Sequence, residues 1–236
     1  MTTQVREMSG LAEYLSQRLW DVREMMFRGV ADSNYALTPS IGRYKAKDPE
    51  SHLRFERTIL EEFKQRAVRY MSHEPRGEFE WLFLAQHYGI PTRLLDWTSN
   101  PLVAMYFACE RSPDRECAVY KITMTRWYTN FDESDPFEIK EVGGLQPRHT
   151  DIRYINQAGV FTILPEPTKP MDWPHIAKYV FNSQAKDTIR WQLRKMGIHA
   201  SFIYPSLESI ARDVIHEHEG ILSGGTIRSS GSLFEL

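Results

Sequence analysis

The chain has 236 residues, of which 42% are hydrophobic, 25% are charged and 12% are aromatic, and its formal net charge is -2. That length allows one large core, and the aromatic content argues against a disordered chain. The near-neutral charge gives no electrostatic reason to expect nucleic-acid or membrane binding, although it leaves room for a local basic patch. The first ten residues lack the apolar core of a signal peptide, and no run of about 18 apolar residues could span a membrane. We therefore expect a folded cytoplasmic protein with no membrane partner.

Common metal and nucleotide signatures are missing from the sequence. Its two cysteines, Cys109 and Cys117, can form neither a disulfide framework nor a four-cysteine zinc site, so we expect buried free thiols. His216 and His218 have no third ligand at a suitable spacing. The HExxH, GxGxxG and GxxxxGK[ST] patterns are also absent. We expect no bound metal.

Helical spacing of apolar residues and short apolar runs define the elements of the first third of the chain. In order these are a helix over 9–20 with Ser9 as its cap, a strand over 25–30, a loop over 31–43, a helix over 49–71 and a helix over 78–89. Gly89 is expected to end the last of these helices as a C-cap.

The elements in the middle of the chain meet at a strand end. In order they are a strand over 93–98, a cap at Ser99 or Asn100, a helix over 101–110 with Pro101 in its first turn, a strand over 117–124 and an irregular segment over 126–150. The irregular segment contains two glycines and two prolines, and we expect it to cover or flank a site.

Turn residues and caps divide the last third of the chain. The predicted elements are a turn around Gln157 to Gly159 entering a strand up to 164, a proline-rich loop over 165–174, a strand over 179–184, a helix over 187–198 capped by Asp187 and ended by Gly197, and a helix over 206–219. The Gly- and Ser-rich residues 220–236 are typical of a flexible tail. Strands mixed with helices of unequal length indicate an α+β fold, with a mixed core sheet and flanking helices, in one domain over 1–219.

Polar side chains are concentrated in residues 86–108, QHYGIPTRLLDWTSNPLVAMYFA. Within thirteen positions this stretch contains His87, Tyr88, Arg93, Asp96, Thr98 and Ser99. Few structural loops need so many different donors and acceptors, so we interpret the stretch as part of a functional site.

Three segments resemble the FRG domain family, which is named for its Phe-Arg-Gly motif. They are Phe27-Arg28-Gly29, the run QHYGIPTRLLDWT with its following helix LVAMYFA, and RYINQAGVF (153–161). The closing helices extend the resemblance over roughly residues 10 to 215, so it implies a single FRG-type domain.

The order of motifs also resembles that of ADP-ribosyltransferases of the arginine, serine, glutamate class. Arg28 is in the place of their first-strand arginine, Asp96-Trp97-Thr98 in the place of their S-T-S strand, and Gln157 in the place of their glutamate. The resemblance implies an ADP-ribosyltransferase-like fold that binds NAD as its substrate. Asp, Trp and Gln replace the Ser, Thr and Glu of that pattern.

Cleavage of the bond between nicotinamide and ribose requires a cation for phosphate and an acceptor near the sugar. Arg28 and Arg93 could bind phosphate through their guanidinium forks, and Gly29 would let a ligand approach the backbone. Asp96 or Gln157 could hold ribose hydroxyls.

The remaining polar and aromatic residues of the stretch suggest further roles. His87 is a candidate general base, and Tyr88 and Trp97 could stack on a base. Thr98 and Ser99 could cap a helix whose N-terminus is a natural anion site.

Each assignment has a structural alternative. Arg28 could pair with a core carboxylate, and Arg93 with Asp96 could be a buried ion pair that locks the strand. Thr98 and Ser99 could act only as caps, and Gln157 could serve backbone groups in its turn.

Three functions follow from these residues. The first is an NAD-binding ADP-ribosyltransferase or NAD glycohydrolase that acts as a bacterial toxin or antiviral-defence effector, with a protein or nucleic acid as acceptor. The second is a non-enzymatic module that recognises a nucleotide, nucleic acid or protein in the same cleft. The third is phosphoester hydrolysis by His87 and Asp96, which metal dependence would reveal.

Overall fold

The computed structural model describes residues 3–17, 19, 24–71, 74–129, 135–147 and 155–218. The predicted tail over 220–236 lies outside these residues. Among the residues described, no helix has both the length and the apolar character that a membrane crossing requires.

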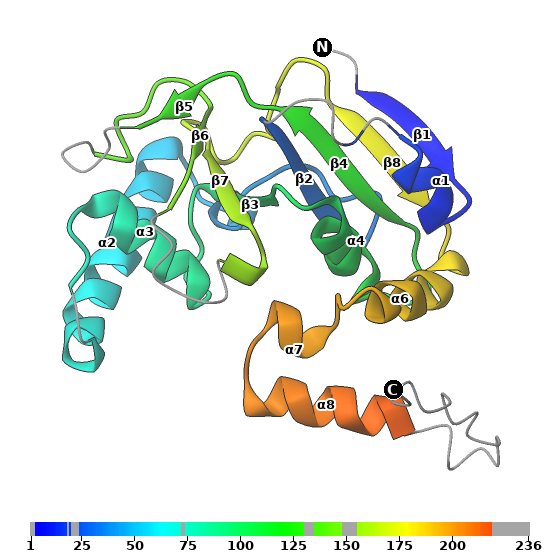
Figure 1. Ribbon diagram of the computed structural model, residues 1–236. Coiled ribbons are helices and arrows are strands. Elements are labelled where there is room, and N and C mark those ends of the chain that lie inside the picture. The colour runs from blue at the N-terminus through cyan, green and yellow to red at the C-terminus, as the bar shows by residue number, and fades with distance from the viewer. Residues whose placement is uncertain are drawn as a thin grey trace.

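Within this part of the chain, eight strands form one mixed sheet in the order β1-β8-β4-β2-β3-β7-β6-β5 (Figure 1). The strands are β1 (Gln4–Met8), β2 (Met25–Val30), β3 (Leu94–Thr98), β4 (Cys117–Thr123), β5 (Trp127–Tyr128), β6 (Gly143–Leu145), β7 (Gly159–Ile163) and β8 (Ala177–Phe181). The pairs β1–β8 and β5–β6 are parallel, and the others are antiparallel. The predicted α+β fold with a mixed core sheet and flanking helices is confirmed.

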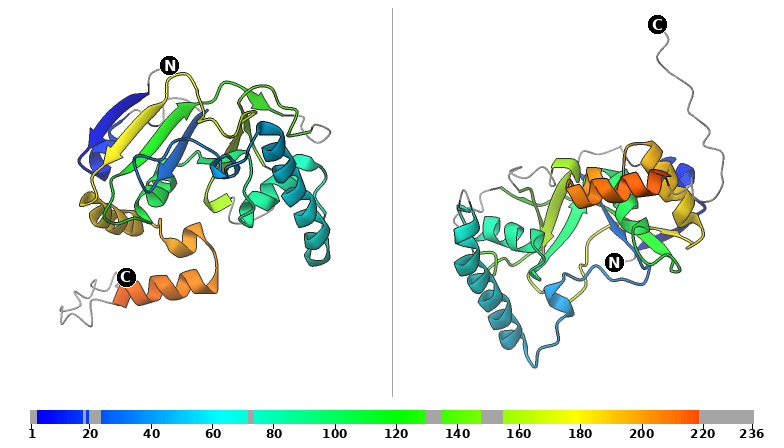
Figure 2. Two further views of the ribbon diagram at one scale, coloured as in Figure 1. Left: turned by 180° about the vertical axis from the view of Figure 1, so that it is seen from behind. Right: turned by 90° about the horizontal axis from the view of Figure 1, so that it is seen from below.

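Helices flank the sheet on one face and at one end (Figures 1 and 2). The α-helices are α1 (Leu11–Leu15), α2 (Pro49–Ala67), α3 (Glu78–His87), α4 (Pro101–Cys109), α6 (Ala185–Lys195), α7 (Ala200–Ile203) and α8 (Leu207–His218), with single 3-10 turns at Ile41–Arg43 and Val68–Tyr70. Helices α1, α4 and α6 share one apolar cluster with β1, β2, β4 and β8. Helices α2 and α3 pack on β3, β6 and β7.

Local sequence explains the ends of the long helices. Asp48 caps α2 by accepting a hydrogen bond from the Ser51 amide, and Asn100 caps α4 by accepting one from the Leu102 amide. Of the two predicted caps for α4, Ser99 and Asn100, the structure uses Asn100. Gly89 and Gly197 follow α3 and α6 with φ of 87° and 80°, so the two predicted glycine stops are confirmed.

Two predicted caps are wrong. The N-cap of α1 is Gly10, while Ser9 donates from its amide and hydroxyl to the carboxylate of Glu13. Asp187 lies inside the first turn of α6, whose N-cap is Gln184. In both cases the helix begins one or more residues away from the strongest capping side chain.

Four short elements were not predicted, namely β1, β5, β6 and α7. Only the last residue of β1 is buried, so that strand has no apolar alternation. In β6, Gly143 and Gly144 lie so close to the rings of Tyr128 and Trp127 that a Cβ would be 2.4 and 2.7 Å from ring atoms. These glycines were interpreted as turn formers, but they let two aromatic rings cover a strand.

The sheet is narrowly joined at its centre. β2 pairs with β4 along all six of its residues, from Met25 to Val30, but it pairs with β3 at one position, Phe27 with Thr98. Both strands lie wholly within the described residues. Beyond that pair they separate, and a space opens between two halves of the sheet.

Gly29 allows α4 to pack directly on β2. A Cβ on Gly29 would lie 1.9 Å from the carbonyl oxygen of Ala104 and 2.6 Å from the amide nitrogen of Ala108. Both are backbone atoms of a helix and cannot rotate away. The absence of a side chain at Gly29 therefore serves helix packing, and the approach of a ligand to its backbone stays a prediction.

We expect Gly29→Ala to destabilise the protein by at least about 2 kcal/mol, because α4 must move to admit the methyl group. In a thermal melt this corresponds to a Tm lower by at least about 4 °C. Gly10→Ala is the matched control, since a Cβ there meets no atom within 4 Å. Equal melting temperatures for the two variants would contradict the packing argument.

Candidate functional site

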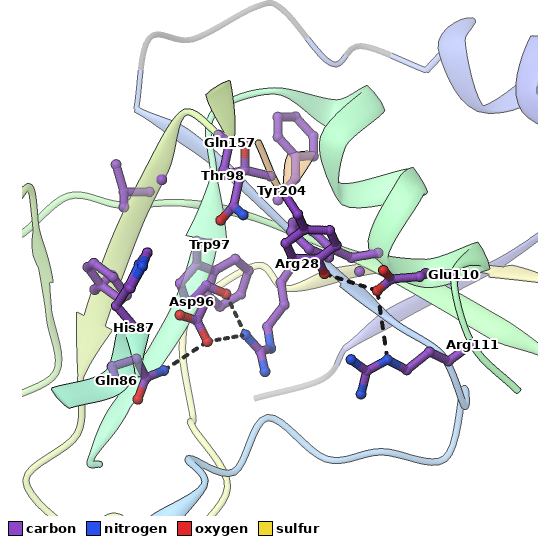
Figure 3. Close-up of a pocket in the computed structure, with 16 residues that line it drawn as sticks. Arg28, Gln86, His87, Asp96, Trp97, Thr98, Glu110, Arg111, Gln157 and Tyr204 are labelled. Carbon is purple, nitrogen blue, oxygen red and sulfur yellow. Dashed lines mark hydrogen bonds and ion pairs between the residues drawn. The ribbon is translucent and has the colours of Figure 1, made fainter. Parts of the chain in front are cut away.

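A cavity of about 360 Å³ lies where β2 and β3 separate (Figure 3). Its wall is built from β2, β3, the end of α3, the C-terminal end of α4, β7 with the turn before it, and the residue after α7. These segments are far apart in the sequence, so the pocket exists only in the folded chain.

Arg28 bridges the space between the two strands. Its Nη1 donates to the carbonyl oxygen of Asp96 at 2.5 Å and lies 3.6 Å from the Asp96 Oδ2. The side chain of Arg28 is 17% exposed, and that of Asp96 is 59% exposed. Where β2 and β3 no longer pair, the guanidinium group of Arg28 thus donates to β3 the hydrogen bond that a backbone amide of β2 would otherwise supply.

The electrostatic environment of Arg28 suits an anion. Burial lowers the pKa of Arg28 from its ordinary value, the negative charge of Asp96 opposes that shift, and the positive charge of Arg43 adds to it. Arginine remains protonated at neutral pH despite such a shift. A half-buried cation with a second cation nearby would be stabilised by an incoming phosphate.

The side chain of Asp96 is held from a second direction. Gln86 Nε2 donates to Asp96 Oδ2 at 2.8 Å, and the Thr92 hydroxyl donates to Gln86 Oε1. His87, the last residue of α3, lies on the same wall (Figure 3). Asp96 is therefore an oriented carboxylate whose negative charge lies beside Arg28.

Thr98 and Gln157 line the pocket, but their polar groups also bind the protein. The Thr98 hydroxyl donates to the carbonyl oxygen of Gln157 at 2.6 Å and accepts from the amide of Asn100 at 2.9 Å. Gln157 Nε2 donates to the carbonyl oxygen of Ile203 at 3.0 Å. These contacts join the end of β3, the turn before β7 and α7.

The wall opposite Asp96 contains residues that the sequence did not reveal. They are Phe107, Glu110 and Arg111 at the end of α4, and Tyr204 directly after α7. The Tyr204 hydroxyl donates to Glu110 Oε2 at 3.1 Å across 94 positions of sequence. The one sequence signal for these residues was the charged pair Glu110-Arg111 after an apolar helix, and that pair suggested only that the helix ends there.

The pocket lies at the C-terminal end of α4, and not at the capped N-terminus that the sequence favoured. Pro101 and Leu102 do not line it, and the Leu102 amide already donates to Asn100. The anion site expected at that helix N-terminus is therefore not part of this pocket.

Two further candidates lie outside the pocket, and a third is buried in its wall. Ser99 is exposed outside the pocket, and its amide donates to Ala158. Tyr88 is 68% exposed and lines a separate groove of about 740 Å³ between α2 and α3. Trp97 lines the pocket but is 3% exposed, and its Nε1 donates to the Thr162 hydroxyl in the core.

Arg93 is a core residue. Its Nε and Nη2 donate to the two carboxylate oxygens of Glu56 at 3.0 and 2.7 Å, and both side chains are almost fully buried. The predicted Arg93–Asp96 ion pair is wrong, because Asp96 pairs with Arg28. Arg93 does not line the pocket.

The irregular segment packs beside this buried pair. The Phe137 ring lies 4.6 Å from the Arg93 guanidinium carbon and 4.3 Å from that of Arg57, which also pairs with Asp135 at 2.9 Å. None of its described residues, 126–129 and 135–147, lines the pocket. This part of the segment covers the end of the domain near α2.

Seven of the predicted site residues thus line one pocket, and three do not. Those that line the pocket are Arg28, Gly29, His87, Asp96, Trp97, Thr98 and Gln157, and those outside it are Tyr88, Arg93 and Ser99. Among the described residues, no group of three or more His, Cys, Asp or Glu side chains gathers as metal ligands would.

The pocket is concave, has charged and aromatic walls, and lies between the central strands of an α+β sheet. Small-molecule sites are typically concave pockets of this composition. The sequence profile of the FRG domain matches residues 23–117, which include Arg28, His87, Asp96 and Thr98. The resemblance to the FRG domain family is therefore confirmed over this segment. No curated protein and no solved structure matches the chain.

We expect Arg93→Met to destabilise the protein by about 3–5 kcal/mol, because it leaves the charge of Glu56 buried without a partner. The double substitution Glu56→Leu with Arg93→Met removes both charges and should recover part of that loss in denaturant unfolding. Glu56→Leu alone completes the set. If the losses of stability of Arg93→Met and Glu56→Leu simply add in the double variant, Arg93 and Glu56 do not form a coupled buried pair.

Asp213 fixes α7, which carries Tyr204, to α8. Its Oδ2 accepts from the Ser201 amide at 2.8 Å and contacts His199 Nδ1 at 3.0 Å. Burial raises the pKa of the Asp213 carboxyl, but the hydrogen bonds from Ser201 and His199 outweigh it and leave the pKa below the ordinary value.

A lowered folded-state pKa stabilises the protein above the unfolded pKa of about 3.9, and this stabilisation is lost as the pH falls through the folded value. We therefore expect Asp213→Asn to lower Tm at pH 7, with the difference from wild type shrinking as the pH falls below the unfolded pKa. A difference that stays constant down to pH 2.5 would contradict a role for the ionised carboxylate.

Proposed function

We propose that the pocket binds NAD and that the protein cleaves the bond between nicotinamide and ribose, as an ADP-ribosyltransferase or an NAD glycohydrolase. The observation that carries the proposal is the meeting of Arg28, Asp96 to Thr98 and Gln157 in one cavity. The resemblance to ADP-ribosyltransferases placed these three positions on three separate segments, and it requires them to converge.

The charges of the pocket support a pyrophosphate ligand. Arg28 offers a guanidinium that burial has partly stripped of water, and Arg111 offers a second, 79% exposed guanidinium on the opposite wall. Arginine forks bind phosphate oxygens in pairs. We place the pyrophosphate between these two arginines.

The reaction itself needs little covalent chemistry from the protein. The bond between C1′ and the nicotinamide nitrogen breaks, its electron pair leaves with neutral nicotinamide, and the oxygen of water or of an acceptor bonds to C1′ while its proton is released. Positive charge develops on the sugar before the new bond forms, and the Asp96 carboxylate can stabilise it. His87 is positioned on the same wall to receive the proton.

An enzyme of this kind would act in the bacterial cytoplasm as a toxin or an antiviral-defence effector, because consuming NAD or modifying a macromolecule halts growth. Its acceptor would be water, a protein or a nucleic acid.

The second candidate is a non-enzymatic module that recognises a nucleotide, or a nucleic acid or protein, in the same pocket. The hydrogen bonds of Thr98 and Gln157 to the backbone favour this candidate, since those groups already serve the fold. Such a module would gain stability from a ligand and release no product.

We expect the purified full-length protein to release nicotinamide from NAD, measured by chromatography, and Arg28→Ala to reduce the rate by at least about 100-fold. Arg54→Ala, which removes a 75% exposed arginine from α2, should retain the full rate. Because Arg28 also holds two strands together, Asp96→Asn is a second variant, which keeps the bond from Arg28 to the Asp96 carbonyl and should also slow the reaction.

The outcomes separate the candidate functions. A rise in Tm with NAD or ADP-ribose but no product would favour the recognition module. Absence of both nicotinamide release and any ligand-dependent shift would reject the NAD proposal. Cleavage that depends on an added metal would indicate phosphoester chemistry instead.

A further inference from the structure

Two carboxylates line the pocket, and their surroundings differ. Asp96 lies 3.6 Å from the Arg28 guanidinium and is the more exposed of the two at 59%. Glu110 is 21% exposed and lies on the other wall, at the end of α4. In Figure 3, Arg28 lies between the two carboxylates, closer to Asp96.

Tyrosine hydroxyls hold both oxygens of Glu110. Tyr204 donates to Oε2 at 3.1 Å, and Tyr106 lies 3.5 Å from Oε1. Burial raises the pKa of the Tyr106 hydroxyl well above its ordinary value, and the charge of Glu110 adds to this shift, so Tyr106 remains a neutral donor. Neutral donors orient the carboxylate without cancelling its charge.

The nearest cation neutralises Glu110 only weakly. Arg111 Nε is 3.8 Å from Glu110 Oε2, and the Arg111 side chain is 79% exposed. Ion pairs of such exposed groups contribute little, because water and salt screen them. Glu110 therefore presents a negative charge, with unused lone pairs, on the pocket wall.

Aromatic rings surround this carboxylate. Phe107 and Tyr204 line the pocket beside Glu110, and their ring centroids are 6.3 Å apart. Tyr106 contacts both rings edge to face, at 6.0 and 6.4 Å. Half-buried aromatic faces next to a carboxylate are the combination that recognises planar organic cations.

We infer that Glu110, with Phe107 and Tyr204, forms a subsite for a planar, positively charged ring, and that this subsite makes the pocket selective for the oxidised form of a nicotinamide dinucleotide. Arg28 would take the phosphate end of the same ligand. The inference rests on the proposed function and adds which redox form of the dinucleotide the pocket prefers. The oxidised nicotinamide ring carries a positive charge, and the reduced ring is neutral. The two ligands differ by one hydride, and only the oxidised one would be attracted to the carboxylate of Glu110.

The test compares two ligands of nearly equal size by calorimetry, carba-NAD+, in which the ribose bond cannot be cleaved, and its dihydro form. We expect wild type to bind the oxidised form at least about tenfold more tightly, a fraction of the full interaction between unit charges about 4 Å apart near a protein surface. Glu110→Gln keeps the shape and an acceptor for tyrosine but removes the charge. It should bring the ratio of the two affinities close to one.

Glu116→Gln is the matched control. Glu116 lies, like Glu110, between α4 and β4, but it contacts Ser33 outside the pocket. It should keep the wild-type ratio. A ratio is measured within one variant, so a change in overall stability does not imitate the effect.

Four results would overturn the inference. Equal binding of both forms by wild type, or an unchanged ratio in Glu110→Gln, rejects the cation subsite while leaving NAD binding intact. If Glu110→Gln no longer binds the neutral dihydro form, the cation subsite is also rejected, because removing the charge of Glu110 should lower the affinity for that ligand little. If wild type binds neither form nor ADP-ribose, the proposed function itself fails and the subsite fails with it.

Discussion

The hydrogen bond from Arg28 to the Asp96 carbonyl spans the place where the central sheet divides. β2 and β3 share one paired position, so their remaining backbone groups need other partners, and a charged side chain supplies one. A cavity opens beside that bridge. Gly29, the next residue, lets α4 pack directly on β2, which brings the end of that helix to the cavity. Arg28 and Gly29 together thus position the cavity between β2 and β3 and one of its walls.

The dense polar stretch over 86–108 serves three places in the fold. Asp96 and His87 face the pocket, Arg93 enters the core to pair with Glu56, and Tyr88 faces the groove between α2 and α3. Strand alternation separates Asp96 from its neighbours, and the turn after α3 separates His87 from Tyr88. Proximity in sequence therefore did not mean proximity in the site.

The sequence predicted those elements whose signals are local. Apolar spacing predicted α2, α3 and α6, alternation predicted β4, and a preceding turn predicted β7, because each signal depends on residues a few positions apart. It could not predict β1, which pairs with a strand about 170 residues later, or the contact between Glu110 and Tyr204. The pocket wall that contains Glu110 and Tyr204 depends on such a distant contact, and nothing in a short window of sequence encodes it.

We propose that one pocket binds a dinucleotide with its phosphates at Arg28. A crystal structure of the protein with ADP-ribose tests this directly. We expect the pyrophosphate between Arg28 and Arg111 and the terminal ribose between Asp96 and Glu110. Ligand bound in the groove between α2 and α3, or a pocket that stays closed to ADP-ribose, would contradict it.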